Sequence, residues 1–315
     1  MIYLKHLILI VIVIFNSCTS SKSNYNGRIG MTCMDLTNPF FKLIANVMEK
    51  EAIKKGFKLV ALSGDQDPAK QNNQIVDFAV QGYDAIFLNP VDSKSSGEGV
   101  KKAYSLGVPV FTFDVQVTDE EASNLIFSHI GSDNYQGGRL AAKSMMNVTG
   151  DLGDIAILSL PRITSCKLRV DGFRDYLKEK NSRIRIVTEL SGEGSREEGF
   201  RVATDILQSN PNLSGIFAIN DPSALGAYAA VKKAGKANQI KIVGFDASPA
   251  GKQAVYDKQL VDSPQQFPRK MAIGTVEAFF DYLDGNLSSE NIFIPCEHYF
   301  YENSINDESR KNEQW

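Results

Sequence analysis

The sequence has little of what most redox, metal-dependent and nucleophilic enzymes need. Among 315 residues there are three histidines, four cysteines and one tryptophan. The histidines (His6, His129 and His298) are scattered, and no nucleophile elbow, HExxH motif or Walker loop occurs. The cysteines lie far apart, and none belongs to a CxxC pair. We therefore expect a protein that is not an enzyme, with no metal site, no cofactor and no disulfide framework.

An excess of positive charge is also missing. The formal net charge is −3 and the isoelectric point is about 5.8. Nucleic-acid-binding domains usually carry a basic surface, so we expect no nucleic-acid partner. The stretch Gly131–Gly138 contains glycines but no GxGxxG, which argues against a nucleotide-binding loop. What is present is a globular chain, 43% hydrophobic, that is long enough for two domains.

The apolar run at the start of the chain is too short to span a bilayer as a mature helix. Residues 7–15 follow Lys5 and His6 and have the length of a signal-peptide core, about nine residues. Ser17 before Cys18 resembles the bacterial lipoprotein cleavage box, although the two residues before Ser17 are looser than usual. We predict a signal peptide over 1–17, a lipidated Cys18 and a lipid-anchored linker over 18–27. An ordinary cleaved signal with an incidental cysteine is the alternative.

Beyond this leader, apolar runs alternate with helical patterns. Continuous apolar strands separated by helices of about a dozen residues indicate a parallel sheet covered on both faces. Because the pattern repeats in both halves, we predict an α/β fold of two similarly built, Rossmann-like domains with a cleft between them. The predicted strands are 28–33, 57–62, 85–88, 109–113, 125–130, 154–158, 184–190, 213–218, 240–245, 260–263, 292–294 and 298–301. The predicted helices are 41–55, 69–80, 94–105, 135–148, 165–180, 196–209, 224–234, 249–257 and 269–283, before a polar tail, 302–315, that we expect to be disordered.

The stretch Thr37-Asn38-Pro39-Phe40-Phe41 joins the first strand to the first helix. Pro39 cannot continue a strand ladder, but its fixed φ suits a first helical turn that Asn38 would cap. This turn lies at the carboxyl end of a strand, which is where open α/β sheets bind ligands. It offers one amide and two adjacent aromatic rings. A capped helix with two core phenylalanines would show the same pattern.

Polar residues recur where other predicted strands end. Asp114 follows the strand 109–113, Asn220 follows 213–218, and Asp246 follows 240–245. Arg169 lies in the first turns of a helix, and Gln266 comes soon after the last long strand. A single Asp at such a position is commonly the N-cap of the next helix, whereas several in both halves fit a convergent polar site.

The chemistry of these groups suits a neutral, polyhydroxylated ligand. Each sugar hydroxyl both donates and accepts; amides do the same, carboxylates accept, and the arginine fork donates. The apolar face of a sugar ring can pack against Phe40 or Phe41. A phosphate ligand would instead favour a Gly-rich loop and several basic groups.

In order and spacing, seven short segments resemble one known family. From Arg28 to about Asn303 the chain is similar to sugar-binding periplasmic proteins of the ribose/galactose-binding type, the substrate receptors of bacterial ABC importers. The segments are Thr37-Asn38-Pro39-Phe40-Phe41, Asn89-Pro90-Val91-Asp92-Ser93, Thr112-Phe113-Asp114, Gly131-Ser132-Asp133-Asn134, Arg169-Val170-Asp171-Gly172-Phe173, Ala218-Ile219-Asn220-Asp221 and Val243-Gly244-Phe245-Asp246.

The resemblance implies two lobes joined by three crossing segments, near Ser132, Gln266 and Ile294. The first lobe would be 28–131 with 267–291, the second 132–266 with 292–303, and 304–315 a polar tail. A monosaccharide or related polyol would bind between the lobes, and closure would present it to an ABC transporter permease. The protein would be a monomer, periplasmic or at the cell surface, and held to a bacterial membrane by its lipid.

Carried over residue by residue, the ligand contacts would include two accepting carboxylates, a donating arginine and two rings flanking the sugar. Three departures make ribose itself doubtful: Val115 stands where ribose receptors have an arginine, Gly194 where they have a stacking aromatic, and Met34 where they have a serine. Another monosaccharide, a polyol or an autoinducer-2-like furanosyl ligand fits equally. The expected ligand-binding residues are Asn38, Phe40, Phe41, Asp114, Arg169, Asn220, Phe245, Asp246 and Gln266.

Two further readings share this architecture. A receptor of the same fold could signal to a membrane kinase or chemoreceptor, and the changes at Val115 and Gly194 raise that option. A LacI-type repressor core would need a DNA-binding helix-turn-helix before it, where this sequence has the export signal and a polar linker.

Overall fold

A computed structural model describes residues 25–286, 290–311 and 315. The predicted signal peptide and Cys18 lie outside the described residues. Within the described part of the chain, no helix combines the length and hydropathy needed to cross a membrane. The described residues also contain no cluster of His, Cys, Asp and Glu side chains suited to a metal ion.

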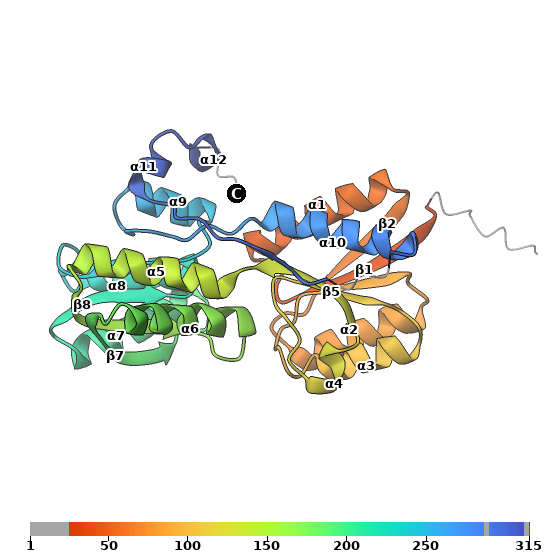
Figure 1. The fold of residues 1–315 in the computed structure, drawn as a ribbon, viewed down its shortest axis with the longest axis horizontal. Coiled ribbons are helices and arrows are strands. Elements are labelled where there is room, and N and C mark those ends of the chain that lie inside the picture. Colours follow the sequence, from red (N-terminus) through yellow and green to blue (C-terminus); the bar gives the residue numbers. More distant parts are fainter. Residues whose placement is uncertain (1–24, 287–289, 312–314) are drawn as a thin grey trace, which may run out of the picture.

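The first lobe is built on a six-stranded, wholly parallel sheet with helices on both faces (Figure 1). Its strand order is β10-β5-β4-β3-β1-β2. Helices α1 and α10 pack together on one face, and α2, α3 and α4 cover the other. The strands are β1 (Gly27–Cys33), β2 (Phe57–Ser63), β3 (Ala85–Leu88), β4 (Val110–Phe113), β5 (Ile126–Ser132) and β10 (Ile292–Ile294). The helices are α1 (Pro39–Lys54), α2 (Pro68–Val80), α3 (Gly97–Ser105), α4 (Glu120–Ser123) and α10 (Pro268–Leu283).

The second lobe repeats this plan with a four-stranded parallel sheet of order β7-β6-β8-β9. Helix α5 packs on α6, and α7 packs on α8. The strands are β6 (Leu152–Ser159), β7 (Arg183–Ser191), β8 (Leu213–Ala218) and β9 (Lys241–Val243), and the helices are α5 (Asn134–Thr149), α6 (Thr164–Glu179), α7 (Arg196–Ser209), α8 (Asp221–Lys233) and α9 (Pro249–Tyr256). The predicted α/β class with two parallel-sheet lobes is confirmed.

The chain passes between the lobes three times, and hydrogen bonds tie the crossings together (Figure 1). The amide of Asp133 in the first crossing donates to the carbonyl of Ile294 in the third, at 2.8 Å. Gln265 in the second exchanges backbone hydrogen bonds with Glu297 in the third. Strand β10 pairs with β5, so residues 292–294 belong to the first sheet, and their predicted assignment to the second lobe is wrong.

The C-terminal part departs most from prediction. The predicted strand at 260–263 makes only an isolated bridge through Asp262, and residues 298–301 form no strand. The strand predicted at 240–245 stops at Val243. The predicted disorder of 302–315 is wrong for residues 302–311, which include the short helices α11 (Tyr301–Ser304) and α12 (Glu308–Lys311) packed on α9.

One apolar cluster runs through both lobes and fixes them face to face. It extends from the α1–α10 side of the first sheet to the α5–α6 side of the second. Where the lobes meet it includes Val91 and Val115 from the first lobe, and Leu160 and Ile163 from the second, all buried. The structure is therefore a closed arrangement, with the carboxyl ends of the strands of both sheets turned toward a shared cleft.

Candidate ligand-binding site

Eight of the nine predicted ligand residues line one cavity between the lobes. Its volume is ≈ 90 Å³, which reflects the closed arrangement. The ninth, Phe245, does not line it; its fully buried ring lies beneath Arg169, with the guanidinium carbon 3.9 Å from the ring centroid. Phe245 thus supports Arg169 and does not line this cavity. The eight lining residues are Asn38, Phe40, Phe41, Asp114, Arg169, Asn220, Asp246 and Gln266.

Arg169 is the most constrained of these side chains. Its guanidinium is 4% exposed and donates from Nε to Asn134 Oδ1 at 2.8 Å and from Nη1 to the carbonyl of Ile219 at 2.7 Å. Nη1 also lies 3.3 Å from Asp246 Oδ1. Hydrogen bonds in the plane and the Phe245 ring below fix the group's orientation before any ligand arrives.

Asp246 and Gln266 form the second-lobe wall next to Arg169. Gln266 Nε2 donates to Asp246 Oδ1 at 2.6 Å, and their backbones are also hydrogen-bonded. Gln266 Oε1 is buried and has no hydrogen-bond partner among the described residues. An unpaired buried amide oxygen costs about 1–3 kcal/mol, so this atom calls for a donor within the cavity.

Asp114 faces this wall from the first lobe. Its Oδ2 accepts from Asn89 Nδ2 at 3.0 Å. Burial raises the pKa of Asp114 to about 7; the nearby Arg169 opposes this rise and Asp246 adds to it. Burial also raises the pKa of Asp246, again opposed by Arg169. Asp114 has one side-chain donor and Asp246 has donors on Oδ1, so both carboxyls keep acceptor capacity that the hydroxyls of a ligand can fill.

Both aspartates also have unusual backbones. Asp114 has φ +59° and Asp246 has φ +106°, a region that non-glycine residues rarely occupy. Such conformations persist where the surrounding structure fixes them, and they concentrate at functional sites. Asp114 comes directly after β4 and Asp246 three residues after the end of β9, and both line the cleft.

The first-lobe aromatic wall follows from the start of α1. Asn38 Oδ1 accepts from the amide of Phe40 at 3.0 Å, so Asn38 is the N-cap that the sequence predicted. The cap uses only the side-chain oxygen, and Asn38 lines the cavity. Phe40 and Phe41 meet edge to face, with centroids 5.2 Å apart, and both are nearly buried.

Asn220 contributes less than expected. Its Oδ1 caps α8 by accepting from the amide of Ser223, and its Nδ2 donates to the carbonyl of Gly194. Both ends of its amide are therefore already engaged within the second lobe. Gly194 has φ +64°, and Val115 and Met34 add apolar surface to the cavity.

Three buried polar residues that were not predicted hold the site together. Asn89 accepts from the amide of Met34 at 3.2 Å in addition to holding Asp114, and Asn134 holds Arg169. Asp221 accepts from Ser248 and Ser263, which shape the loop after Asp246. Asn89 directly follows β3, and Asp221 comes three residues after the end of β8, next to Asn220. The positional signal that pointed to Asp114 and Asn220 could therefore have identified them.

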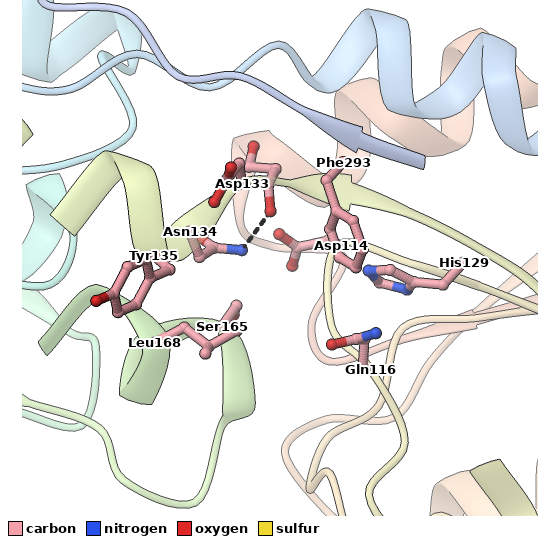
Figure 2. Close-up of a pocket in the computed structure, with 10 residues that line it drawn as sticks. Asp114, Gln116, His129, Asp133, Asn134, Tyr135, Ser165, Leu168 and Phe293 are labelled. Atoms are coloured by element: carbon pink, nitrogen blue, oxygen red, sulfur yellow. Dashed lines mark hydrogen bonds between the residues drawn. The ribbon is translucent and has the colours of Figure 1, made fainter. Parts of the chain in front are cut away.

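A second opening reaches the site from the hinge side (Figure 2). This hollow of ≈ 220 Å³ shares Asp114 and Ser165 with the main cavity. Figure 2 shows His129 and Phe293 of the first lobe on one side of this hollow and Tyr135 of the second lobe on the other. Burial lowers the pKa of His129 to about 3, so this imidazole is neutral and adds no charge beside Asp114.

Comparison with known proteins gives concordant findings. A family model described as "Periplasmic binding protein domain" matches residues 29–287. The ribose import binding protein of Bacillus subtilis is 32% identical over 278 residues, 88% of each chain. The D-apiose import binding protein of Actinobacillus succinogenes is 33% identical over 224 residues, 71% of each chain. A solved ABC transporter periplasmic solute binding protein from A. succinogenes 130z with bound D-allose superimposes with a TM-score of 0.82 at 27% identity, covering 89% of this chain and 100% of its own.

Proposed function

Because this chain belongs to the periplasmic binding protein family, we propose that it binds a monosaccharide or similar polyol between its lobes for delivery to an ABC transporter permease. Members of this family are solute receptors, not enzymes, and they work outside the cytoplasmic membrane. The names of the similar proteins, which concern ribose, apiose and allose, support a small sugar.

The observation that carries the ligand class is the imbalance of donors and acceptors in the cavity. Gln266 Oε1 is unpaired, and the carboxyls of Asp114 and Asp246 have acceptor capacity left beyond their present donors, while Arg169 offers a fixed donor. A molecule with several hydroxyls satisfies both needs, and Phe40 and Phe41 give its apolar face a surface. Anions are disfavoured because Asp114 and Asp246 face the same space.

The side chain of Val115 cannot hydrogen-bond a ligand. We therefore infer a ligand that makes one hydrogen bond fewer at this edge of the cavity than ribose does. Val115 is completely buried and lines the cavity beside Asp114. A polar group of the ligand placed against it would be desolvated without a partner, which costs about 1–3 kcal/mol. We therefore favour an aldose or polyol that turns a C–H face toward Val115.

Interlobe hydrogen bonds support closure around the ligand. Arg162 Nη1 donates to the carbonyl of Val91 at 2.9 Å, and the amide of Thr164 donates to Ser93 Oγ at 3.0 Å. Both pairs join the second lobe to the first. We assign 28–131 with 267–294 to the first lobe and 132–266 with 295–311 to the second.

A ligand screen on the purified mature protein tests this proposal. D-ribose, D-apiose, D-allose, myo-inositol and autoinducer-2 would each be added in a thermal-shift assay, with affinity measured by calorimetry. A ligand at about 100 times Kd stabilises the native state by about 2.7 kcal/mol, which gives a clear shift. The Asp246→Asn variant is the control, since it keeps the shape and removes the carboxylate. If no polyol shifts the melting temperature of the folded protein, the proposed ligand class is wrong.

Transport and signalling are separated by a growth experiment. If deletion of the gene abolishes uptake of the sugar that the protein binds, delivery to a permease is supported. If the deletion strain takes up that sugar normally but loses its transcriptional or chemotactic response to it, the sensor alternative is favoured. We further propose that the protein acts as a monomer, which gel filtration with light scattering would check.

We also propose that Cys18 carries a lipid that holds the receptor at a bacterial membrane. Support comes from the small residue before Cys18 and the apolar run over 7–15. Cys18→Ser should move the protein from the membrane fraction to the soluble fraction, measured by fractionation and immunoblotting. Continued membrane association of the folded variant would contradict the lipid anchor.

A further inference from the structure

The C-terminal tail is fixed to the second lobe by buried polar contacts. Asp307 accepts from Tyr299 OH at 2.7 Å and pairs with Lys252 Nζ at 3.2 Å. Lys252 is 2% exposed, so this ion pair is shielded from water. Arg310 donates from Nη1 to Gln253 Oε1 at 2.8 Å and lies over the ring of Tyr256. The tail up to Lys311 therefore moves with α9.

The last residue of this tail contacts the other lobe. The ring of Trp315 packs edge to face on Phe40, with centroids 5.2 Å apart and an interplanar angle of 70°. Phe40 in turn packs on Phe41, so three rings form a continuous set at the start of α1. In Figure 1 the C-terminus lies between the two lobes, on the side of α1 and α10.

Trp315 stands at the mouth of the ligand cavity. It lines a groove of ≈ 830 Å³ whose walls include Pro39 of the first lobe and Pro249 of the second. Asn38 and Asp246 line both this groove and the ligand cavity, which makes the two spaces neighbours.

We propose that Trp315 is an affinity-determining residue that clasps the two lobes in the closed state. Its tail belongs to the second lobe and its ring contacts Phe40 of the first, so the contact is made only when the lobes are together. An interaction that is present in one state alone shifts the population toward that state. It therefore raises the affinity for any ligand that requires that state. The effect on affinity rests on the proposed function; the clasp itself does not.

The chain offers a direct optical readout, because Trp315 is its only tryptophan. Acrylamide quenching of Trp315 would be compared between wild type and Phe40→Leu, first without ligand and then with a saturating sugar that closes the lobes. If the clasp forms, the variant should be quenched more strongly and emit at longer wavelength. Equal quenching of the two proteins in both states would overturn the proposal.

The effect on affinity is measured with a sugar that binds the wild type in the screen above, D-allose for example. Aromatic pairs of this kind stabilise by amounts that correspond to about a 3- to 10-fold change in Kd. Trp315→Ala should weaken binding by this factor, Trp315→Phe should retain most of the affinity, and the exposed Tyr104→Ala on α3 should change nothing.

A double-mutant cycle separates the clasp from a general effect of the tail. If Trp315→Ala weakens binding as strongly in the Phe40→Leu background as in wild type, the two rings are uncoupled and the proposal is overturned. A smaller effect in that background supports it. Should no sugar bind the wild type, the proposed function fails, while stronger quenching of ligand-free Phe40→Leu would still support the clasp.

Discussion

Single residues in this cleft are arranged for binding at a cost in stability. Asp114 is buried, has a positive φ, and receives its one side-chain hydrogen bond from Asn89 among the described contacts. Its pKa of about 7 lies above the ordinary value of 3.8, so the native state binds a proton more tightly than the unfolded chain. Protonated Asp114 therefore makes its full contribution to the stability of the native state below about pH 4, and this contribution is lost as the pH rises through 7.

Asp114→Asn should raise the melting temperature of the ligand-free protein at pH 8 by several degrees, because it removes a buried charge. Asparagine tolerates the positive φ, and its oxygen can still accept from Asn89. At pH 4, where Asp114 is already protonated, the variant and wild type should melt within about a degree of each other. A variant that is less stable than wild type at pH 8 would contradict the raised pKa.

Asp246→Ala should weaken sugar binding more than tenfold in calorimetry. The substitution removes a ligand acceptor and also frees Gln266 Nε2 and Arg169 Nη1, which both contact its carboxylate. Arg169 is then a buried cation with fewer partners, so stability should fall as well. Unchanged affinity in a folded variant would remove Asp246 from the site.

At the level of elements, close helix packing sets where Arg169 lies. A Cβ on Gly138 of α5 would lie 2.0 Å from the carbonyl of Arg169, and one on Gly172 of α6 would lie 2.1 Å from that of Tyr135. The two helices therefore touch backbone to backbone through glycine. Any side chain at either position must push α5 and α6 apart, which would shift Arg169 relative to Asp246.

Gly138→Ala should lower both stability, by about 1–3 kcal/mol, and sugar affinity. Gly226→Ala is the matched control, since its Cβ would lie 2.2 Å from the carbonyl of Arg196, where α8 packs on α7, and Arg196 does not line the cavity. The control should lose stability with a smaller change in Kd. Equal losses of affinity in both variants would show that α5–α6 packing has no special role.

Elements with continuous apolar strands and clear caps were predictable from sequence alone. The turn at Asn38-Pro39 is an example, because capping and a fixed φ act within a few residues. The C-terminal region was not, since its structure depends on distant partners: Asp262 binds Ser144 and the amide of Tyr299, and Asp307 binds Lys252. The same limit applies to the candidate site: strand ends in the sequence pointed to Asp114 and Asp246, which line the cavity, but not to the packing of Phe245 beneath Arg169.

For the molecule as a whole, closure depends on direct contacts between the lobes, and one of them is made by Arg162, which also lines the ligand cavity. Arg162 spans the cleft to the carbonyl of Val91 and is partly exposed. Arg162→Ala should raise the rate of ligand dissociation a few-fold in stopped-flow experiments, because the closed state loses one interlobe bond. Arg185→Ala, which breaks an exposed pair with Asp154 inside the second lobe, should leave the rate unchanged. Equal rates in all three proteins would exclude Arg162 from closure.

The position of β10 has a consequence for the order of assembly during synthesis. The second sheet is complete once residue 243 has been made, whereas the first sheet waits for Ile292–Ile294 to cover the edge of β5. Pairing partners some 160 residues apart in sequence form late, because a long loop must close before they meet. During synthesis, the first lobe therefore cannot complete its sheet until nearly all of the chain has been made. This delay suits an exported polypeptide, which must remain unfolded until it has left the cytoplasm.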